Sequence, residues 1–362
     1  MPKLTTAYIG LGSNLGDRNA YIKAALNALA ETKAIELSRK SDLIETAPLA
    51  GANQPKYLNA VAEIKTALTA EDLLRKLTDI ETSLGRVRKE KWSPRIIDLD
   101  LLLFSSDVIN HPDLIVPHPQ MHLRSFVLKG LCQLNPNLLH PIIKEPISEL
   151  AARLNSCDFV HNPHLPQLVS VAGIIGVGKT TLAKKLSALL GYKLLLEPYD
   201  KNPFLPDVYA GKKELALDSQ LFFLTHRAEQ LNHNTLLNGR VAITDYVFDK
   251  ELIYARLLLD AQQLALYEEI YAQFTTKIVV PVLVIYLTDS AQNCLQRIHK
   301  RNRPYEQKIE LKFLEALSCD YDRLFAGWKT SPLIRKNMSD FDCTMPKNVE
   351  HLANQIRSYI AV

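Results

Sequence analysis

The sequence has little cysteine, little glycine and no long apolar run. Its 362 residues include 5 cysteines and 13 glycines. The cysteines are scattered and form no C-x-x-C pair, which excludes a disulfide scaffold or a zinc cage and suits a reducing compartment. The longest apolar run, 278–287, contains Pro281, whereas a membrane-spanning helix needs about 20 apolar residues. We therefore expect no membrane partner.

Charge is also nearly balanced. The formal net charge is +4 and neither half forms a basic arm, so we expect no nucleic-acid partner. The start, MPKLTTAYIG, lacks the charged and apolar regions of a signal peptide, and we expect a cytoplasmic protein. The length predicts two or three globular domains, at about 150 residues each. Six of the few glycines lie within 10–16 and 173–178, which are therefore candidate ligand loops.

The two halves have different patterns. In the first half, apolar periodicity predicts a mixed α+β domain, with strands at 4–11, 57–66 and 96–104 and helices at 18–31 and 70–84. Thr69 is the expected cap of the second helix. The pattern stops near 155–167, where prolines and asparagines indicate a linker. We therefore place one domain at 1–155, a linker at 156–167 and a second domain at 168–362.

The second half alternates strands and helices. It predicts strands at 168–174, 193–197, 240–245 and 279–288, separated by helices at 179–190, 214–238, 249–274, 290–301 and 308–325. Strands that alternate with helices indicate an α/β domain with a parallel, doubly wound sheet.

The segment KWSPRIIDLDLLLF, 91–104, carries the first candidate site. Asp98 and Asp100 are two residues apart on a predicted strand and so share one face. Carboxylates in an apolar run need a partner, and Mg²⁺ combines one or two carboxylates with substrate phosphates. Nearby cations suit phosphoryl or pyrophosphoryl transfer; these are Arg86, Arg88, Lys89, Lys91 and Arg95. On spacing alone, an edge strand with salt-bridged aspartates fits equally well.

Further strings strengthen the first interpretation. W-x-P-R-x-x-D-L-D occurs together with YIGLGSNLGDR, TAPLAGANQPKYLNAVAEI and VPHPQMHLRSFVL. Over about residues 4–150 the chain thus resembles 6-hydroxymethyl-7,8-dihydropterin pyrophosphokinase, an enzyme of folate synthesis. The resemblance implies a ferredoxin-like α+β fold. It also implies transfer of the β,γ-pyrophosphoryl group of ATP to the pterin hydroxymethyl group, with release of AMP.

The resemblance also implies roles for single residues. Asp98 and Asp100 would hold two Mg²⁺ ions, and Arg86 and Arg95 would neutralise the transferring group. The implied ATP contacts are Glu81, His118 and Arg124; the implied pterin contacts are Tyr57, Asn59 and Phe126; Trp92 would lie on a closing loop. The sequence departs from the family in a shorter loop between Arg88 and Trp92 and in Pro119. A domain that only assists folding is the alternative.

Residues 173–180, GIIGVGKT, carry the second candidate site. They match G-x-x-x-x-G-K-[ST] between a predicted strand and a predicted helix, the context of a phosphate-binding loop. Backbone N–H groups of such a loop hold phosphates, while Lys179 would reach the β- and γ-phosphates and Thr180 would help to hold Mg²⁺. The expected ATP-binding residues of this segment are Gly173, Gly176, Gly178, Lys179, Thr180 and Thr181.

Two carboxylates and three arginines complete this second site. Glu197 and Asp245 end predicted strands at the edge where such sheets bind ligands, and Glu197 could accept a hydroxyl proton. Arginines bind phosphate oxygens with a rigid fork, so the cluster at one helix end indicates an arginine lid: Arg297, Arg301 and Arg303. Taken alone, this run also fits a solvated basic helix end.

Over about residues 168–325 the chain resembles the deoxynucleoside kinases, specifically the bacterial deoxyguanosine and deoxyadenosine group. The resemblance rests on EPYDKNPFLPDVY, QLFFLTHRAEQ, ITDYVFDKELIYA and RIHKRNRPYEQ. It implies that Glu197 is the base for the 5′-hydroxyl of a purine deoxynucleoside, with ATP as donor and Asp245 assisting one Mg²⁺. Gln220 and Arg227 would contact the nucleobase and the acids, and Glu306 the sugar 3′-hydroxyl. A homodimer through the helices of this domain is expected.

One departure is that tyrosine follows Asp245 where many relatives have arginine. The role of that arginine would pass to Arg227 or to the lid, or it would be dispensable. Two alternatives for the second domain remain: a kinase resembling the thymidylate kinases, and a non-catalytic nucleotide sensor or dimerisation module.

Overall fold

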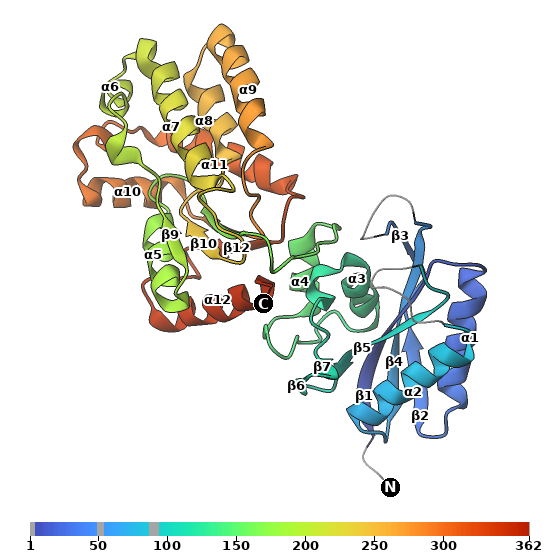
Figure 1. Cartoon of the computed structure of the whole chain (residues 1–362). Coiled ribbons are helices and arrows are strands. Elements are labelled where there is room, and N and C mark those ends of the chain that lie inside the picture. Colours follow the sequence, from blue (N-terminus) through green and yellow to red (C-terminus); the bar gives the residue numbers. More distant parts are fainter. Residues whose placement is uncertain (1–3, 49–53, 87–93, 362) are drawn as a thin grey trace. The chain divides into compact units, whose positions relative to one another are not determined.

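The computed structural model describes residues 4–48, 54–86 and 94–361. The chain divides into two compact units, Met1–Val160 and His161–Val362 (Figure 1). Arg88, Lys89, Lys91 and Trp92 lie outside the described residues.

The first unit is built on an antiparallel sheet. Its strand order is β2-β4-β1-β5, and β3 pairs with β4 beyond the end of β2. A separate hairpin joins β6 to β7. The strands are β1 (Thr5–Ser13), β2 (Ile35–Lys40), β3 (Ile44–Thr46), β4 (Tyr57–Thr66), β5 (Asp98–Phe104), β6 (Ile109–His111) and β7 (Leu114–Val116). The helices are α1 (Arg18–Glu31), α2 (Ala70–Ser83), α3 (Ser125–Leu134) and α4 (Ile147–Leu154).

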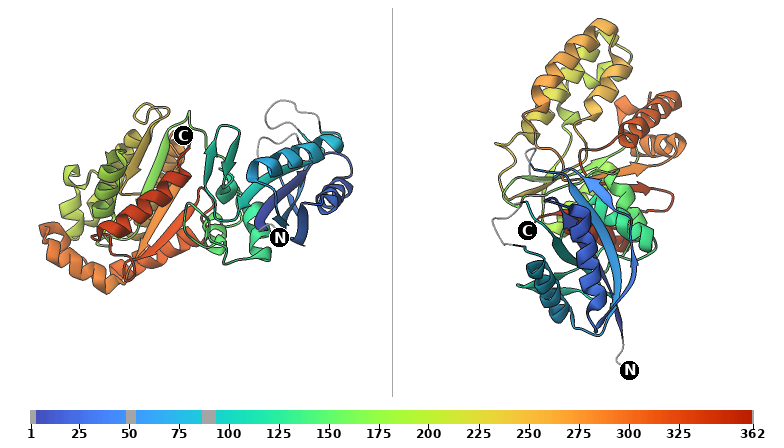
Figure 2. Two further views of the ribbon diagram at one scale, coloured as in Figure 1. Left: turned by 90° about the horizontal axis from the view of Figure 1, so that it is seen from below. Right: turned by 90° about the vertical axis from the view of Figure 1, so that its right-hand side faces the viewer.

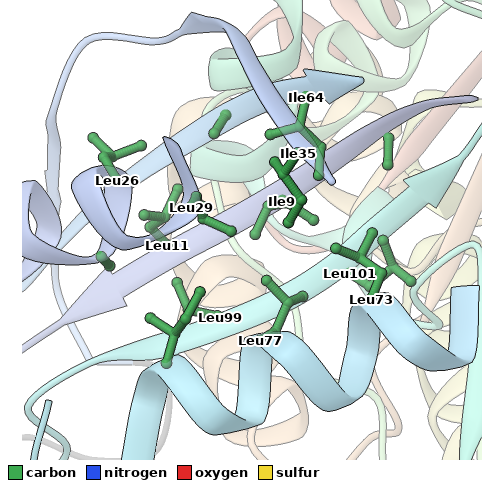
Figure 3. Packing of buried hydrophobic residues seen from close by; sticks show 14 of the residues in the cluster. Ile9, Leu11, Leu26, Leu29, Ile35, Ile64, Leu73, Leu77, Leu99 and Leu101 are labelled. Carbon is green, nitrogen blue, oxygen red and sulfur yellow. The ribbon is translucent and has the colours of Figure 1, made fainter. Parts of the chain in front are cut away.

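Helices cover both faces of this sheet. Helices α1 and α2 bury one face, where Leu29 and Leu77 pack against Ile9 and Leu99 (Figure 3). Helices α3 and α4 bury the other face around Leu128. The apolar residues of the four helices therefore fix the sheet from both sides, and polar side chains remain at the ends of its strands.

The predicted elements of this unit are largely confirmed. Helix 18–31 and strand 57–66 have the predicted bounds, and the Thr69 side chain caps α2 by accepting a hydrogen bond from the Asp72 N–H. The strand predicted at 96–104 begins at Asp98. Helices α3 and α4 and strands β2, β3, β6 and β7 were not among the predicted elements.

The second unit has a wholly parallel sheet. Its order is β12-β11-β8-β10-β9, and each adjacent pair is parallel. This confirms the predicted parallel sheet. The strands are β8 (Gln167–Ala172), β9 (Lys193–Leu195), β10 (Val241–Thr244), β11 (Leu283–Thr288) and β12 (Leu333–Asn337). Helices lie on both faces: α5 (Lys179–Leu190), α6 (Leu205–Tyr209), α7 (Ala216–Leu231), α8 (Lys250–Leu258), α9 (Ala261–Thr275), α10 (Ala291–Arg301), α11 (Leu311–Ala326) and α12 (Pro346–Tyr359).

Two helix groups flank this sheet. Helices α7, α8 and α9 contact one another, and their buried residues form a core with β8 and β10 that includes Leu224, Ala242 and Tyr267. Helix α12 packs beside α5 (Figure 2). Strand β9 is two residues shorter than predicted, so Glu197 follows it rather than ending it. No helix within residues 4–48, 54–86 and 94–361 combines the length and apolar character needed to cross a membrane.

We predict that Leu77→Ala lowers the free energy of unfolding of the first unit by about 2–5 kcal/mol, because its side chain is fully buried and truncation leaves a cavity. Urea denaturation of the whole chain, followed by circular dichroism, measures the change. Leu139→Ala is the matched control, because Leu139 in the same unit is 56% exposed, and it should change stability by no more than about 0.5 kcal/mol. Equal losses for the two variants would contradict the assigned core.

Candidate active sites

A cavity in the first unit opens beside strands β1 and β5. Asp98 and Asp100 face it from β5, while Leu99 between them is buried on the opposite face, as the alternation predicts. In the antiparallel register Gly12 lies opposite Asp98 and Gly10 opposite Asp100. The absence of side chains at these glycines leaves room beside the carboxylates. The space measures about 740 Å³, part of it open to solvent.

Three arginines contact the two carboxylates. Nη1 of Arg86 lies 2.5 Å from Oδ1 of Asp98, and Nη1 of Arg95 lies 2.6 Å from Oδ2. Nη1 of Arg124 lies 3.4 Å from Oδ2 of Asp100. Burial and the charge of Asp100 raise the pKa of Asp98, against the effect of the arginines. Strand β5 is an edge strand, so both interpretations of the spacing fit, and the cavity beside the aspartates favours a ligand site.

Two further residues hold these arginines in place. The Asn14 side chain accepts a hydrogen bond from the Arg95 N–H at 2.7 Å, and the Asn14 N–H donates to the Arg95 carbonyl at 3.1 Å. Glu81 accepts from the Leu99 N–H at 2.6 Å and pairs with Arg86. Burial raises the pKa of Glu81 to about 7. Glu81 therefore sits behind the strand as a support for Arg86, and Asn14 was not among the predicted site residues.

The predicted pterin contacts also meet at the cavity. Tyr57 and Asn59 line it from β4, and Phe126 lines it from the start of α3. The Asn59 amide donates to the Thr46 hydroxyl at 2.9 Å, and a side chain at position 12 would approach Asn59 Oδ1 to 3.1 Å. His118 lies near Asp100 and Arg124, and burial lowers its pKa against the charge of Asp100.

The donor set of this cavity suits magnesium that arrives with a phosphate ligand. Among the described residues there is no group of three or more His, Cys, Asp or Glu side chains that could enclose a metal. Two aspartates on one strand face match the one or two carboxylates that Mg²⁺ takes when phosphate oxygens complete its shell. The residues therefore fit a site shared between protein and substrate.

In the second unit, the glycine loop links β8 to α5. Gly173 and Gly176 have φ of +140° and +83°, which favours glycine. A Cβ at either position would lie 2.5 Å from a backbone oxygen, that of Leu287 or Cys294, so the loop cannot keep this path with other residues. The Lys179 ammonium donates to the Ile174 carbonyl at 2.8 Å. The helix N-terminus and Lys179 thus meet where a phosphate would bind.

Asp245 joins this loop to the next strand. It follows β10 and is buried. The Thr180 hydroxyl donates to Oδ2 of Asp245 at 2.6 Å, and the Glu197 N–H donates to Oδ1 at 2.9 Å. The hydroxyl and the carboxylate predicted to hold magnesium are therefore in contact, and together they offer the oxygen ligands that this ion prefers.

Glu197 lies at the centre of a buried charge network. Its Oε1 is 2.5 Å from the Lys250 Nζ and also contacts the Arg227 guanidinium. Arg227 in turn pairs with Glu251, which accepts a hydrogen bond from the Tyr267 hydroxyl at 2.5 Å. Burial raises the pKa of Glu197, but Arg227 and Lys250 outweigh it and hold that pKa well below its usual range. The carboxylate is therefore charged and able to accept a proton.

The structure shows which cations lie beside Glu197 although tyrosine follows Asp245 where many relatives have arginine. Tyr246 is fully buried and donates a hydrogen bond to Gln230 Oε1 at 2.6 Å. The cations beside Glu197 are Arg227, which was one of the expected substitutes, and Lys250, which was not expected. Lys250 lies within the string ITDYVFDKELIYA, but its spacing from Asp245 gave no sign that it would reach Glu197.

Of the three lid arginines, Arg301 and Arg303 border the space beside Glu197, and Arg297 borders an adjoining space. Arg301 and Arg303 both contact Glu306, and Arg303 lies 4.0 Å above the Tyr199 ring. Arg297 pairs with Asp289 beside the glycine loop. A cavity of about 810 Å³ brings the nucleoside and phosphate residues together; its polar lining includes Lys179, Thr180, Glu197, Gln220, Arg227, Asp245, Lys250, Arg301, Arg303 and Glu306. Gly176, Gly178 and Thr181 line an adjoining space with Arg297.

Comparisons with known proteins match each unit separately. Residues 8–136 match the family model for 7,8-dihydro-6-hydroxymethylpterin-pyrophosphokinase (HPPK), and residues 169–361 match the model for deoxynucleoside kinase. The chain is 40% identical over 146 residues to the 2-amino-4-hydroxy-6-hydroxymethyldihydropteridine pyrophosphokinase of Aquifex aeolicus, covering 40% of this chain and 90% of that protein. It is 39% identical over 157 residues to the deoxyguanosine kinase of Bacillus subtilis, covering 42% and 76%.

Among solved structures, the deoxyadenosine kinase from M. mycoides with bound dATP is similar at 24% identity and a TM-score of 0.46, covering 53% of this chain and 99% of that one. The family models and the sequence relatives carry the assignment. The chain is a bifunctional kinase: its N-terminal unit belongs to the 7,8-dihydro-6-hydroxymethylpterin-pyrophosphokinase family and its C-terminal unit to the deoxynucleoside kinase family.

Proposed function

We propose that the N-terminal site transfers the β,γ-pyrophosphoryl group of ATP to the hydroxymethyl group of 6-hydroxymethyl-7,8-dihydropterin and releases AMP. The observation that carries this proposal is the aspartate pair that faces a cavity together with three arginines. Phe126 would stack on the pterin and Asn59 would contact its polar edge, while Tyr57 closes the pocket.

The charges of the site indicate a separate role for each group of residues in binding metal and phosphate. Two magnesium ions held by Asp98 and Asp100 would supply positive charge to the ATP phosphates. Arg86 and Arg95 both contact Asp98 and would neutralise charge on the transferring group. Arg124 and His118 would bind the ATP phosphates from the other side of Asp100. Glu81 and Asn14 would position Arg86 and Arg95.

We propose that the C-terminal site transfers the γ-phosphate of ATP to the 5′-hydroxyl of a purine deoxynucleoside. Glu197 would accept the hydroxyl proton as the oxygen attacks phosphorus. Lys179 and the lid arginines would hold the ATP phosphates, and Thr180 and Asp245 would hold one magnesium ion that shields phosphate charge. Gln220 and Arg227 would contact the nucleobase side of the pocket, and Glu306 the sugar. The relative named deoxyguanosine kinase supports a purine substrate.

Four finer points belong to the same proposal. We assign residues 1–155 and 168–362 to the two domains, because the boundary between the compact units falls within the intervening linker. The strand order β2-β4-β1-β5 and, with the short β3 set aside, the β-α-β-β-α-β sequence of β1 to β5 support a ferredoxin-like fold. We also propose a cytoplasmic location, as the scattered free cysteines suggest. A homodimer through C-terminal helices is supported by α9, which buries only Tyr267 of its described residues.

A single assay tests both activities. The whole chain is incubated with ATP, Mg²⁺ and either the hydroxymethyldihydropterin or one deoxynucleoside, and chromatography identifies the adenine nucleotide that forms. AMP with the pterin and ADP with deoxyguanosine or deoxyadenosine are the expected products. If no deoxynucleoside yields ADP but a nucleoside monophosphate does, the second proposal is replaced by a nucleotide kinase.

We predict that Asp98→Asn lowers pyrophosphoryl transfer by about 10²-fold or more, because the amide cannot supply the anionic oxygen that a metal-bound phosphate site needs. AMP formation with the pterin measures the effect. Asp107→Asn is the matched control on the exposed turn after β5 and should leave the rate unchanged. Nucleoside phosphorylation by Asp98→Asn should also persist. Full pterin activity in Asp98→Asn would remove Asp98 from the reaction.

We predict that Glu197→Gln lowers nucleoside phosphorylation by about 10²–10⁴-fold, because glutamine cannot accept the hydroxyl proton. ADP formation with a purine deoxynucleoside measures the loss, and AMP formation with the pterin serves as the internal control. Glu214→Gln, a change at an exposed position of the same unit, should have no effect. An unchanged rate in Glu197→Gln would place the base at another residue.

A further inference from the structure

We propose that Lys250 is a catalytic residue of the nucleoside kinase site, whose ammonium neutralises Glu197 before the reaction and the transferred phosphoryl group during it. This inference rests on the proposed function of the C-terminal site. It assigns to a lysine at the start of α8 the charge that an arginine after Asp245 would otherwise carry.

The position of Lys250 supports this role. Its side chain is 3% exposed, and its Nζ lies 2.5 Å from Oε1 of Glu197. The lysine lines the same cavity as Lys179, Thr180 and Arg301. A buried ammonium therefore contacts the expected base in the cavity that the expected phosphate-binding residues also line. Burial of a charge of this kind is unfavourable unless it has a partner. A lysine with only a structural role at this position would therefore cost the fold stability.

Arg227 is less able to serve the phosphate, although it also contacts Glu197. Its second guanidinium nitrogen is paired with Glu251, which is fully buried and whose other oxygen accepts the Tyr267 hydroxyl. Moving Arg227 would leave the buried Glu251 carboxylate without its cation, which is strongly unfavourable. Among the described residues, by contrast, the one carboxylate that Lys250 contacts is that of Glu197. Lys250 is thus the cation that can exchange partners.

The surroundings of Lys250 permit a small movement of its ammonium. Nζ lies 5.9 Å from the centre of the Tyr246 ring and 5.4 Å from that of Tyr254. Aromatic faces attract cations without fixing the geometry as a carboxylate does, and the four-carbon stem of lysine is flexible. Tyr246 itself is held by Gln230, so it provides a wall for the ammonium rather than a charge.

The proposed step balances as follows. The 5′-hydroxyl gives its proton to Glu197, its oxygen forms a bond to the γ-phosphorus of ATP, and the bond from that phosphorus to the β,γ-bridging oxygen breaks to release ADP. As Glu197 takes the proton it loses its negative charge and with it the need for the ammonium. The positive charge of Lys250 is then available to the oxygens of the phosphoryl group. Charge therefore passes to the phosphate as the proton passes to Glu197.

Substitution of Lys250 tests the inference in the whole chain. Lys250→Met should lower kcat for nucleoside phosphorylation by about 10²-fold, as loss of one preorganised charge does, and should change KM for the nucleoside less than about threefold, because the charge acts in the transition state. Lys250→Arg should recover kcat to within about tenfold of wild type. Arg256→Met is the matched control: it removes a cation of the same helix whose exposed ion pair is with Glu268 of α9, and it should leave kcat unchanged.

The pH profile separates a chemical role from a structural one. The charged groups that face Lys250 are Glu197, Arg227 and Lys179. The aromatic rings that face it are those of Tyr246 and Tyr254. Burial and Arg227 lower the pKa of Lys250 to about 8, against the effect of Glu197. The charged form acts, so wild-type kcat/KM should fall as pH rises through about 8. In Lys250→Arg this decline should move to higher pH, because arginine stays charged.

Each result decides the question. Full kcat in Lys250→Met, equal losses in Lys250→Met and Lys250→Arg, or a basic limb that Lys250→Arg does not move would each overturn the role of Lys250. If Lys250→Met loses activity through unfolding, shown by a lower Tm and lost ATP binding, the arginine variant and its pH profile still decide. Absence of ADP formation by the wild-type chain would instead reject the proposed function.

Discussion

Asp98 and Glu197 are carboxylates that the fold partly withdraws from water, and each is contacted by two cations. Arg86 and Arg95 contact Asp98, while Arg227 and Lys250 contact Glu197. Burial of a carboxylate without such partners is unfavourable enough to neutralise it or to destabilise the fold. The loops and helices that bring these cations to the strand ends are therefore as necessary to each site as the carboxylates themselves.

The two sheets position their functional carboxylates in different ways. In the antiparallel sheet, two aspartates on one edge strand share a face, and glycines on the neighbouring strand leave space in front of them. In the parallel sheet, Glu197 and Asp245 follow separate strands, and the strands bring them to the same carboxyl edge. The aspartate pair of the first site is thus local in sequence, whereas topology brings together Glu197 and Asp245, which lie 48 residues apart.

That difference decides how much the sequence could predict. The spacing of Asp98 and Asp100 is enough to place them on one face, and the glycine pattern is enough to place the phosphate loop between a strand and a helix. Lys250 could not be found in this way, because its contact with Glu197 depends on how α8 packs among α7, α9 and α11. Asn14 was missed for a similar reason: it lies in the first glycine cluster, but its partner, the Arg95 backbone, is 81 residues away.

The elements that were not predicted fall into two groups. Strand β3 has three residues, too few for periodicity to distinguish a helix from a strand. Helices α4 and α12, by contrast, carry buried apolar residues at helical spacing, so their sequences do indicate helices. Strand β12 pairs only with β11 at the sheet edge and carries Arg335 and Lys336, so it lacks the apolar run of a central strand. Tertiary contacts, rather than local preference, therefore determine β3 and β12.

The balance of charge differs between the sites, and the difference fits their proposed chemistry. At Asp98, burial and the neighbouring Asp100 outweigh the arginines and raise the carboxyl pKa. A pair of mutually repelling carboxylates gains from a divalent cation, which suits a site completed by metal-bound phosphate. At Glu197, Arg227 and Lys250 outweigh burial and lower the pKa. A base held in this way is charged but weak, and it strengthens as one of its cations turns to the phosphate. Departure of the Lys250 ammonium toward the transferred group would thus make Glu197 a better proton acceptor when the hydroxyl attacks.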